Sequence, residues 1–211
     1  PYRRQRQMCI RDRYKGPKEY EGFQKDSKKW VIFPKLSYAS HARMEERNVE
    51  IGKDFSQYAW NKVEGSSSEK AIIASGISYA YAKEYLKNHE DIRLIKVATA
   101  YPFPEDFVMT ALEGVKEVIC LEELSPYIEE QVLKLAGRYK LSIKVSGKLD
   151  GKVPHSGENS ANLSADILSE FLGIEKVEQG IELSDAPALP VRPPVLCAGC
   201  PHRASFYAVK Q

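Results

Sequence analysis

Residues 71–76 read Ala-Ile-Ile-Ala-Ser-Gly, an unbroken apolar run that is closed by a serine and a glycine. Two further apolar runs follow at residues 94–100 and 118–121. Unbroken apolar runs of about four to eight residues are typical of strands buried on both faces, as in a parallel sheet. Residues 141–145 alternate between apolar and polar side chains instead. We therefore expect four strands, with the last of them nearer an edge.

Amphipathic helices are predicted between and after these strands. Pro104 and Pro126 suit the first helical position, where a missing N–H costs little, and Ser125 suits an N-cap. Gly173 lies where a helix C-cap is expected, and residues 129–130 place two acids at the positive end of a helix dipole. Apolar residues recur at helical spacing in three stripes: Val108, Ala111, Leu112 and Val115; Ile128, Val132, Leu135 and Ala136; Leu163, Ile167, Leu168 and Phe171.

Strand and helix thus alternate four times between Lys70 and Gly173. Such alternation implies right-handed crossovers and a parallel sheet that is covered by helices on both faces. The sequence predicts an α/β fold, specifically a three-layer α/β/α sandwich with a mostly parallel sheet.

The flanking segments differ from this domain. Residues 14–65 are weakly patterned, and residues 36–58 within them predict one long, charged helix, as in the end of a preceding domain with its connector. Residues 66–182 form the predicted α/β domain. Residues 183–211 begin with a proline-rich linker and then open a further domain. Because a ligand motif lies near the last residue, we expect a piece of a longer protein.

Residues 1–13 hold five arginines, whereas the other 198 residues hold six. A nucleic-acid-binding arm, a localisation signal and a disordered tail are possible interpretations. The segment most resembles translated sequencing-adapter read-through, so we expect it to be non-native and exclude it from the fold.

Composition argues against three classes of protein: nucleic-acid-binding, membrane-spanning and disulfide-rich proteins. The formal net charge is +2, but residues 1–13 contribute +4, so the rest of the chain carries −2 and gives no reason to expect nucleic acid as a partner. No apolar run is long enough to span a bilayer, so no membrane partner is expected. Four cysteines do not make a disulfide framework, which favours a reducing, cytoplasmic location.

Three features could carry chemistry within the α/β domain. Residues 76–80 follow a strand, but they match neither a nucleophile elbow nor a dinucleotide loop, and helix capping by serine is the simpler interpretation. Glu122 and Glu123 end a strand where α/β sheets bind ligands, and could act as a base or metal ligands or lie in solvent. His155 lies in a loop. Cys120 is expected in the core, and His41 and His89 on helix surfaces.

Cys197 and Cys200 form a Cys-x-x-Cys pair that can bring two thiolates to one metal ion or cluster. A reduced, inert pair and a redox dithiol are the alternatives. A dithiol of the thioredoxin type would follow an early strand of its own sheet, whereas this pair follows a linker. The spacing therefore favours a metal or iron–sulfur site that further ligands complete.

The segment around the cysteine pair resembles a motif of a known family. Arg-Pro-Pro-x-Leu-Cys-x-Gly-Cys-Pro-His-Arg, at residues 192–203, is its most diagnostic motif. The family is the alpha subunit of indolepyruvate ferredoxin oxidoreductase, among the thiamine-dependent 2-oxoacid:ferredoxin oxidoreductases, and the similarity runs from about Trp30 to the end. Its other motifs lie at residues 61–65, 72–79, 101–104, 121–130 and 147–151.

The resemblance implies a transketolase C-terminal-like domain at residues 66–182, followed by the start of a thiamine diphosphate-binding domain. It implies oxidative decarboxylation of aryl 2-oxoacids to acyl-CoA, with thiamine diphosphate, Mg²⁺ and [4Fe-4S] clusters as cofactors. The implied partners are a beta subunit, ferredoxin, coenzyme A and the 2-oxoacid.

The resemblance also assigns roles to individual residues. Cys197 and Cys200 become candidate cluster ligands, and Gly199 and His202 candidate cofactor neighbours. The ring-activating glutamate and the magnesium motif of the family have no counterpart here, so no catalytic residue is assigned and we expect the chain alone to be inactive. The rival interpretation is a non-catalytic α/β interaction module whose cysteine pair binds zinc or acts in redox chemistry.

Overall fold

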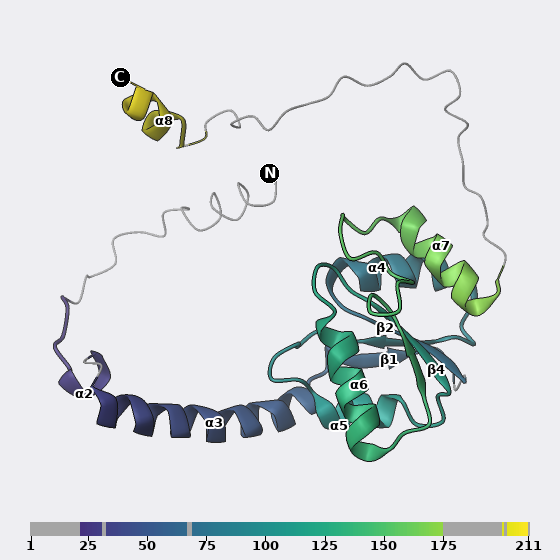
Figure 1. Cartoon of the computed structure of the whole chain (residues 1–211), viewed down its shortest axis with the longest axis horizontal. Coiled ribbons are helices and arrows are strands. Elements are labelled where there is room, and N and C mark those ends of the chain that lie inside the picture. Colours follow the sequence, from purple (N-terminus) through teal and green to yellow (C-terminus); the bar gives the residue numbers. More distant parts are fainter. Residues whose placement is uncertain (1–21, 31–32, 67–68, 175–199, 201, 211) are drawn as a thin grey trace. The chain divides into compact units, whose positions relative to one another are not determined.

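A computed structural model describes residues 22–30, 33–66, 69–174, 200 and 202–210. Of the described residues, 33–66 and 69–174 belong to one compact unit, and 22–30, 200 and 202–210 are assigned to a second. The predictions for the non-native segment at residues 1–13 and for the linker and cysteine motif at residues 183–199 fall outside the described residues. The predicted domain boundaries remain predictions. Figure 1 labels the helices: α2 (Ser27–Trp30), α3 (Pro34–Ser56), α4 (Gly76–Tyr85), α5 (Glu105–Ala111), α6 (Tyr127–Tyr139), α7 (Ala161–Leu172) and α8 (His202–Lys210), with a 3-10 turn η1 (Leu86–Asn88).

Five strands form one sheet in the order β1-β3-β2-β4-β5. β2, β3, β4 and β5 run parallel, and each is followed by a helix, which confirms the predicted α/β/α sandwich. β5 lies at an edge, as its alternating pattern predicted. The strands are β1 (Lys62–Glu64), β2 (Lys70–Ala74), β3 (Arg93–Lys96), β4 (Glu117–Leu121) and β5 (Lys144–Ser146).

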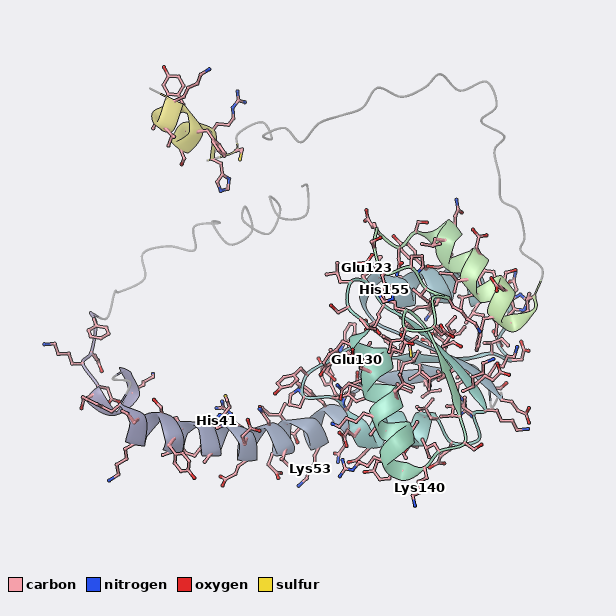
Figure 2. All side chains as sticks on the ribbon, in the orientation of Figure 1. His41, Lys53, Glu123, Glu130, Lys140 and His155 are labelled. Atoms are coloured by element: carbon pink, nitrogen blue, oxygen red, sulfur yellow. The ribbon has the colours of Figure 1, made fainter. Side chains whose placement is uncertain are left out.

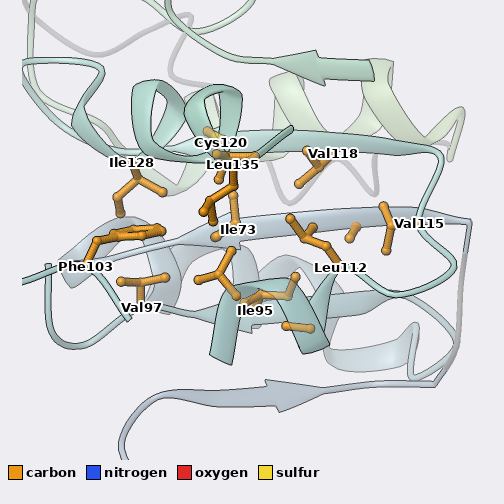
Figure 3. Close-up of a cluster of buried hydrophobic side chains, with 14 residues drawn as sticks. Ile73, Ile95, Val97, Phe103, Leu112, Val115, Val118, Cys120, Ile128 and Leu135 are labelled. Atoms are coloured by element: carbon orange, nitrogen blue, oxygen red, sulfur yellow. The ribbon is translucent and has the colours of Figure 1, made fainter. Parts of the chain in front are cut away.

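The two faces of the sheet carry two separate cores. Ile73 points toward α5 and α6, where it packs with Ile95, Val118 and Leu135 (Figure 3). Its neighbour Ile72 points the other way, into the core beneath α4 and α7. Burying a side chain of this size stabilises the fold by about 1.5–3 kcal/mol. The unbroken apolar runs are therefore explained by burial on both faces.

The helix starts differ from the prediction by one residue. α5 begins at Glu105 and α6 at Tyr127, so Pro104 and Pro126 occupy the N-cap position and not the first helical position. The prediction that Ser125 caps α6 is wrong, because the carboxylate of Glu122, directly after β4, takes that role. Gly173 does end α7, with a φ of 71° that suits glycine.

The predicted long, charged helix is confirmed as α3, and its C-terminal end is fastened to the sheet by Asn61. The buried Asn61 amide donates to the Phe55 carbonyl at 2.7 Å and to Thr99 Oγ1 at 2.6 Å, and its Oδ1 accepts from Ala98 N at 2.7 Å. None of the described helices, α3 included, is long and apolar enough to cross a membrane.

β1 was not predicted, because its sequence Lys-Val-Glu contains no apolar run. It pairs antiparallel with β3 and ends at Gly65, whose φ is 82°. A Cβ atom on Gly65 would lie 1.9 Å from the Ile92 carbonyl oxygen. This close approach holds β1 against the segment that leads into β3.

Gly65→Ala should destabilise the protein far more than Gly114→Ala does. Both glycines have positive φ values, of 82° and 76°, so both alanines suffer the left-handed strain of about 1–2 kcal/mol. Only at Gly65 does a Cβ also collide with backbone, since nothing lies within 4 Å at Gly114. Urea denaturation measures the two losses in free energy of unfolding; equal losses would contradict the close approach.

Candidate functional site

The carboxyl ends of β2 and β4 meet at the point where the sheet's connections diverge. β2 continues into α4 on one face, whereas β4 continues into α6 on the other. Open α/β sheets bind ligands at such a switch point. Residues 76–80 and Glu122 both lie at this edge, because each follows a strand that ends there.

Glu122 is buried, with 5% of its surface exposed. Its carboxylate accepts from Ile128 N at 2.8 Å and Glu129 N at 3.0 Å, and so caps the first turn of α6. Burial raises the pKa of Glu122, although these backbone hydrogen bonds act in the opposite direction. Both carboxylate oxygens of Glu122 accept hydrogen bonds from the start of α6. Glu122 is therefore neither a solvated loop residue nor a free metal ligand, the two roles considered from the sequence.

Glu129 is the second buried carboxylate, at 1% exposure. It accepts from Lys148 N at 2.7 Å and from Leu149 N at 3.1 Å. A Cβ atom on Gly147 would lie 2.5 Å from Glu129 Oε2, so only glycine lets this loop close around the carboxylate. Glu129 thus holds the loop after β5, a role that its helix-dipole interpretation missed.

The remaining space at the switch point is filled by side chains of the same region. Ser78 lies within α4 and its buried hydroxyl accepts from Asn159 Nδ2 at 2.9 Å. Ser75, with no side-chain cap hydrogen bond, occupies the N-cap position of α4. Lys148 is buried and donates to the Pro154 carbonyl oxygen. Ser78 therefore helps to position the loop that contains Asn159. The sequence had suggested that a serine at this place caps the helix.

The histidines and the mid-strand cysteine do not come together. His41 lies on α3 near Glu45, at 3.8 Å, whereas His155 lies on an exposed loop (Figure 2). His89 follows η1 and stacks on Tyr85 with ring centroids 6.4 Å apart. Cys120 is buried in the core, as predicted, and this burial raises the pKa of its thiol.

A groove of about 600 Å³ lies between α3 and the loop after β3. α3 comes near this loop at Gly52, where an added Cβ would make an ordinary contact of 3.7 Å with Pro102 Cβ. Tyr101 is 70% exposed beside the groove, and Glu105 in its wall accepts from Arg138 Nη1 at 3.1 Å. Sequence reasoning did not find this groove; the Tyr-Pro-Phe-Pro motif at residues 101–104 was its only signal.

The predicted cysteine site is described only in part. Cys200 Sγ lies 3.4 Å from His202 Nδ1, at the start of α8. Thiol and imidazole are both ligands of zinc and of iron–sulfur clusters, so this pair fits two positions of such a site. Cys197 and Gly199 lie outside the described residues. Among the residues described, no group of three or more His, Cys, Asp or Glu is placed to hold a metal ion.

Thiamine diphosphate does not fit the switch point. A bound diphosphate needs a magnesium ion held by free oxygen ligands. The two buried carboxylates at this edge, Glu122 and Glu129, are already engaged with backbone N–H groups. The described residues therefore offer this cofactor no site at the switch point.

Comparisons with known proteins agree with the motifs. No protein-family profile matches the chain. Its relatives define a class of oxidoreductase subunits. The particular relatives are indolepyruvate oxidoreductase subunits IorA, and three of them are from Methanothermobacter thermautotrophicus (34% identical over 192 residues), Thermococcus kodakarensis (32% over 204) and Archaeoglobus fulgidus (33% over 187).

These matches cover 90%, 93% and 86% of the chain, but only 31%, 31% and 29% of the relatives. The chain thus spans about a third of the length of the curated relatives it matches. The resemblance drawn from the motifs is confirmed, and the chain is homologous to part of these subunits.

Glu129→Ala should destabilise the protein strongly, whereas Glu130→Ala should not. Alanine at position 129 leaves the Lys148 and Leu149 N–H groups unpaired in a buried site, which costs about 1–3 kcal/mol for each group. Glu130 is the exposed neighbour on the same helix turn. Urea denaturation measures both variants, and similar losses for the two would show that the Glu129 carboxylate does not hold the loop.

Proposed function

We propose that the chain is part of an oxidoreductase that oxidatively decarboxylates aryl 2-oxoacids, indolepyruvate among them. The acyl group passes to coenzyme A and the electrons pass to ferredoxin, with a beta subunit completing the enzyme. One observation carries this proposal: nine-tenths of the chain matches subunits named indolepyruvate oxidoreductase IorA. The name of these relatives as subunits supports a partner subunit.

Within that enzyme, the α/β unit serves as a positioning and contact module. Support comes from its switch point, where Glu122, Glu129 and Asn159 are engaged with the protein's own backbone and side chains. The groove beside α3 instead presents the exposed Tyr101, and aromatic side chains are enriched where two polypeptides meet.

Cys197 and Cys200 are proposed to hold a [4Fe-4S] cluster in the complete enzyme, with Gly199 and His202 beside the cofactors. Such a cluster would supply one-electron transfer. For the residues of this chain, the role is to present two thiolates, of which Cys200 lies just before α8. Thiamine diphosphate and Mg²⁺ remain proposed cofactors of the complete enzyme.

A zinc-binding interaction module is the second candidate. The observation that favours it is the proximity of Cys200 Sγ to His202 Nδ1, at 3.4 Å, because mixed thiolate and imidazole ligation is common for structural zinc. The metal content of the complete enzyme separates the two candidates.

Replacing both Cys197 and Cys200 with serine in the complete enzyme should remove one cluster and abolish electron transfer to ferredoxin. Iron content and electron paramagnetic resonance count the clusters. Cys120→Ala is the matched control, because that thiol is buried in the core and should leave the cluster count unchanged. An unchanged iron content in the double variant, or zinc in place of iron in the parent, would contradict the cluster assignment.

A further inference from the structure

Lysine side chains gather on the face of the sheet that α4 covers. Lys62 of β1 lies directly opposite Lys96 of β3 in the antiparallel register, and like charges in that position destabilise a sheet. Glu64 is on the same face of β1, opposite Leu94, which belongs to the core beneath α4. Lys83, in the last turn of α4, reaches the same place.

Tyr79 lies at the centre of this group. The ammonium nitrogens of Lys96, Lys62 and Lys83 are 4.8, 5.8 and 5.9 Å from its ring centroid. The residue is 8% exposed, and its buried hydroxyl lies beside Lys62, Glu64 and Lys83 without a hydrogen bond of normal geometry to any described residue. A buried hydroxyl without a well-formed hydrogen bond is costly, so this position favours a ligand atom that can accept from Tyr79.

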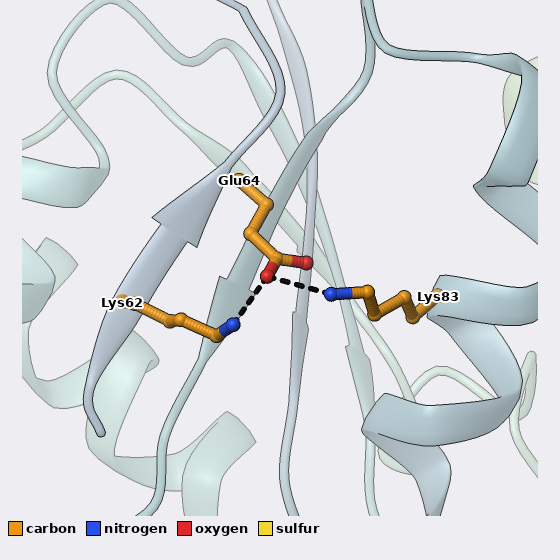
Figure 4. Close-up of polar contacts among 3 residues, drawn as sticks. All are labelled: Lys62, Glu64 and Lys83. Atoms are coloured by element: carbon orange, nitrogen blue, oxygen red, sulfur yellow. Dashed lines mark hydrogen bonds and ion pairs between the residues drawn. The ribbon is translucent and has the colours of Figure 1, made fainter.

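The carboxylate of Glu64 balances only part of the charge. It accepts from Lys62 and, at 2.9 Å, from Lys83 (Figure 4). Partial burial would raise the pKa of Glu64, but hydrogen bonding from both lysines and from Tyr79 prevails and holds the pKa at about 2. Lys96 forms no ion pair within the described part of the chain; it lies over the rings of Tyr79 and Trp60. Near neutral pH, three ammonium groups face one carboxylate, leaving an excess of two positive charges.

A hollow of about 560 Å³ adjoins this cluster. Its lining includes Glu64 and Lys83 of the cluster, and Lys87, His89 and Glu90 add one lysine, one histidine and one acid. Counting the lysines and acids of cluster and hollow together still leaves an excess of two positive charges. The hollow gives a ligand larger than a simple ion space beside the lysines.

We propose that Lys62, Lys83, Lys96 and Tyr79 bind the phosphate group of a phosphorylated small molecule, whose remainder occupies the adjoining hollow. A dianionic phosphate matches the excess charge, and its oxygens can accept from the three ammonium groups and the buried hydroxyl. The site does not depend on the proposed oxidoreductase activity, because it rests only on the geometry of β1, β3 and α4.

The test measures binding of inorganic phosphate and of phenyl phosphate to the full chain by isothermal titration calorimetry at constant ionic strength. Both phosphates should bind, and phenyl phosphate should bind several-fold more tightly if the hollow receives the rest of the ligand. Acetate, a monoanion, is the control for screening. Equal binding of acetate and both phosphates would overturn the proposal, as would binding of a glutamate-rich peptide with no binding of either phosphate.

Variants test the individual groups. Lys83→Met and Lys96→Met should each weaken phosphate binding about tenfold, which corresponds to about 1.4 kcal/mol for a charged hydrogen bond. Lys134→Met, which removes an exposed lysine of α6, should leave binding unchanged. Glu64→Gln should tighten binding several-fold, because it removes the competing carboxylate. Weaker binding in Glu64→Gln would contradict the site. So would a loss in the control Lys134→Met as large as the losses in Lys83→Met and Lys96→Met.

Tyr79→Phe separates binding from folding. Without phosphate, it should leave the melting temperature unchanged or raise it, because it deletes an unpaired buried hydroxyl. With phosphate, it should lose about tenfold in affinity, and most of the stabilisation that the ligand gives the parent protein. Unchanged phosphate affinity in a folded Tyr79→Phe variant would remove Tyr79 from the site.

Discussion

Two buried carboxylates at the carboxyl edge of the sheet hold this domain in its observed arrangement. An ionised carboxylate is costly to bury unless hydrogen bonds replace its water. Glu122 meets that condition with the first N–H groups of α6, and Glu129 meets it with the N–H groups of the loop after β5. The first fixes where α6 begins, and the second fixes the loop that closes the switch point. Glycine at position 147 is a direct consequence, because a side chain there would collide with Glu129.

This arrangement separates the surfaces that remain available for function. The switch point, where comparable sheets bind ligands, is filled by the domain itself. Accessible features lie elsewhere: a groove between α3 and the loop after β3, and a lysine cluster around Tyr79 on the face that α4 covers. A module of this kind contributes to an enzyme through its contacts and through the segments that it positions. The match to IorA subunits fits that role, since the chain spans about a third of their length.

Much of the fold could be predicted from the sequence because its signals are local. Apolar runs marked β2, β3 and β4, and helical stripes marked the covering helices. Apart from the helix caps, the missed features depend on residues that are far apart in the chain. Glu129 could not be recognised as buried without the loop that includes Lys148, 19 residues later. β1 has no apolar run, and the pairing of Lys62 with Lys96 exists only through its antiparallel register. For the cysteine motif, the sequence provides the ligand types, while the structure describes only Cys200 and its neighbour His202.

Amide hydrogen exchange tests the central role of the two carboxylates most directly. The N–H groups of Ile128, Glu129, Lys148 and Leu149 donate to Glu122 or Glu129 in a buried site. They should therefore exchange only when the whole domain unfolds, with a free energy of opening within about 1 kcal/mol of the global value. Exchange of these four amides at the rate of an unstructured peptide, while the amides of β2 and β4 stay protected, would contradict the account.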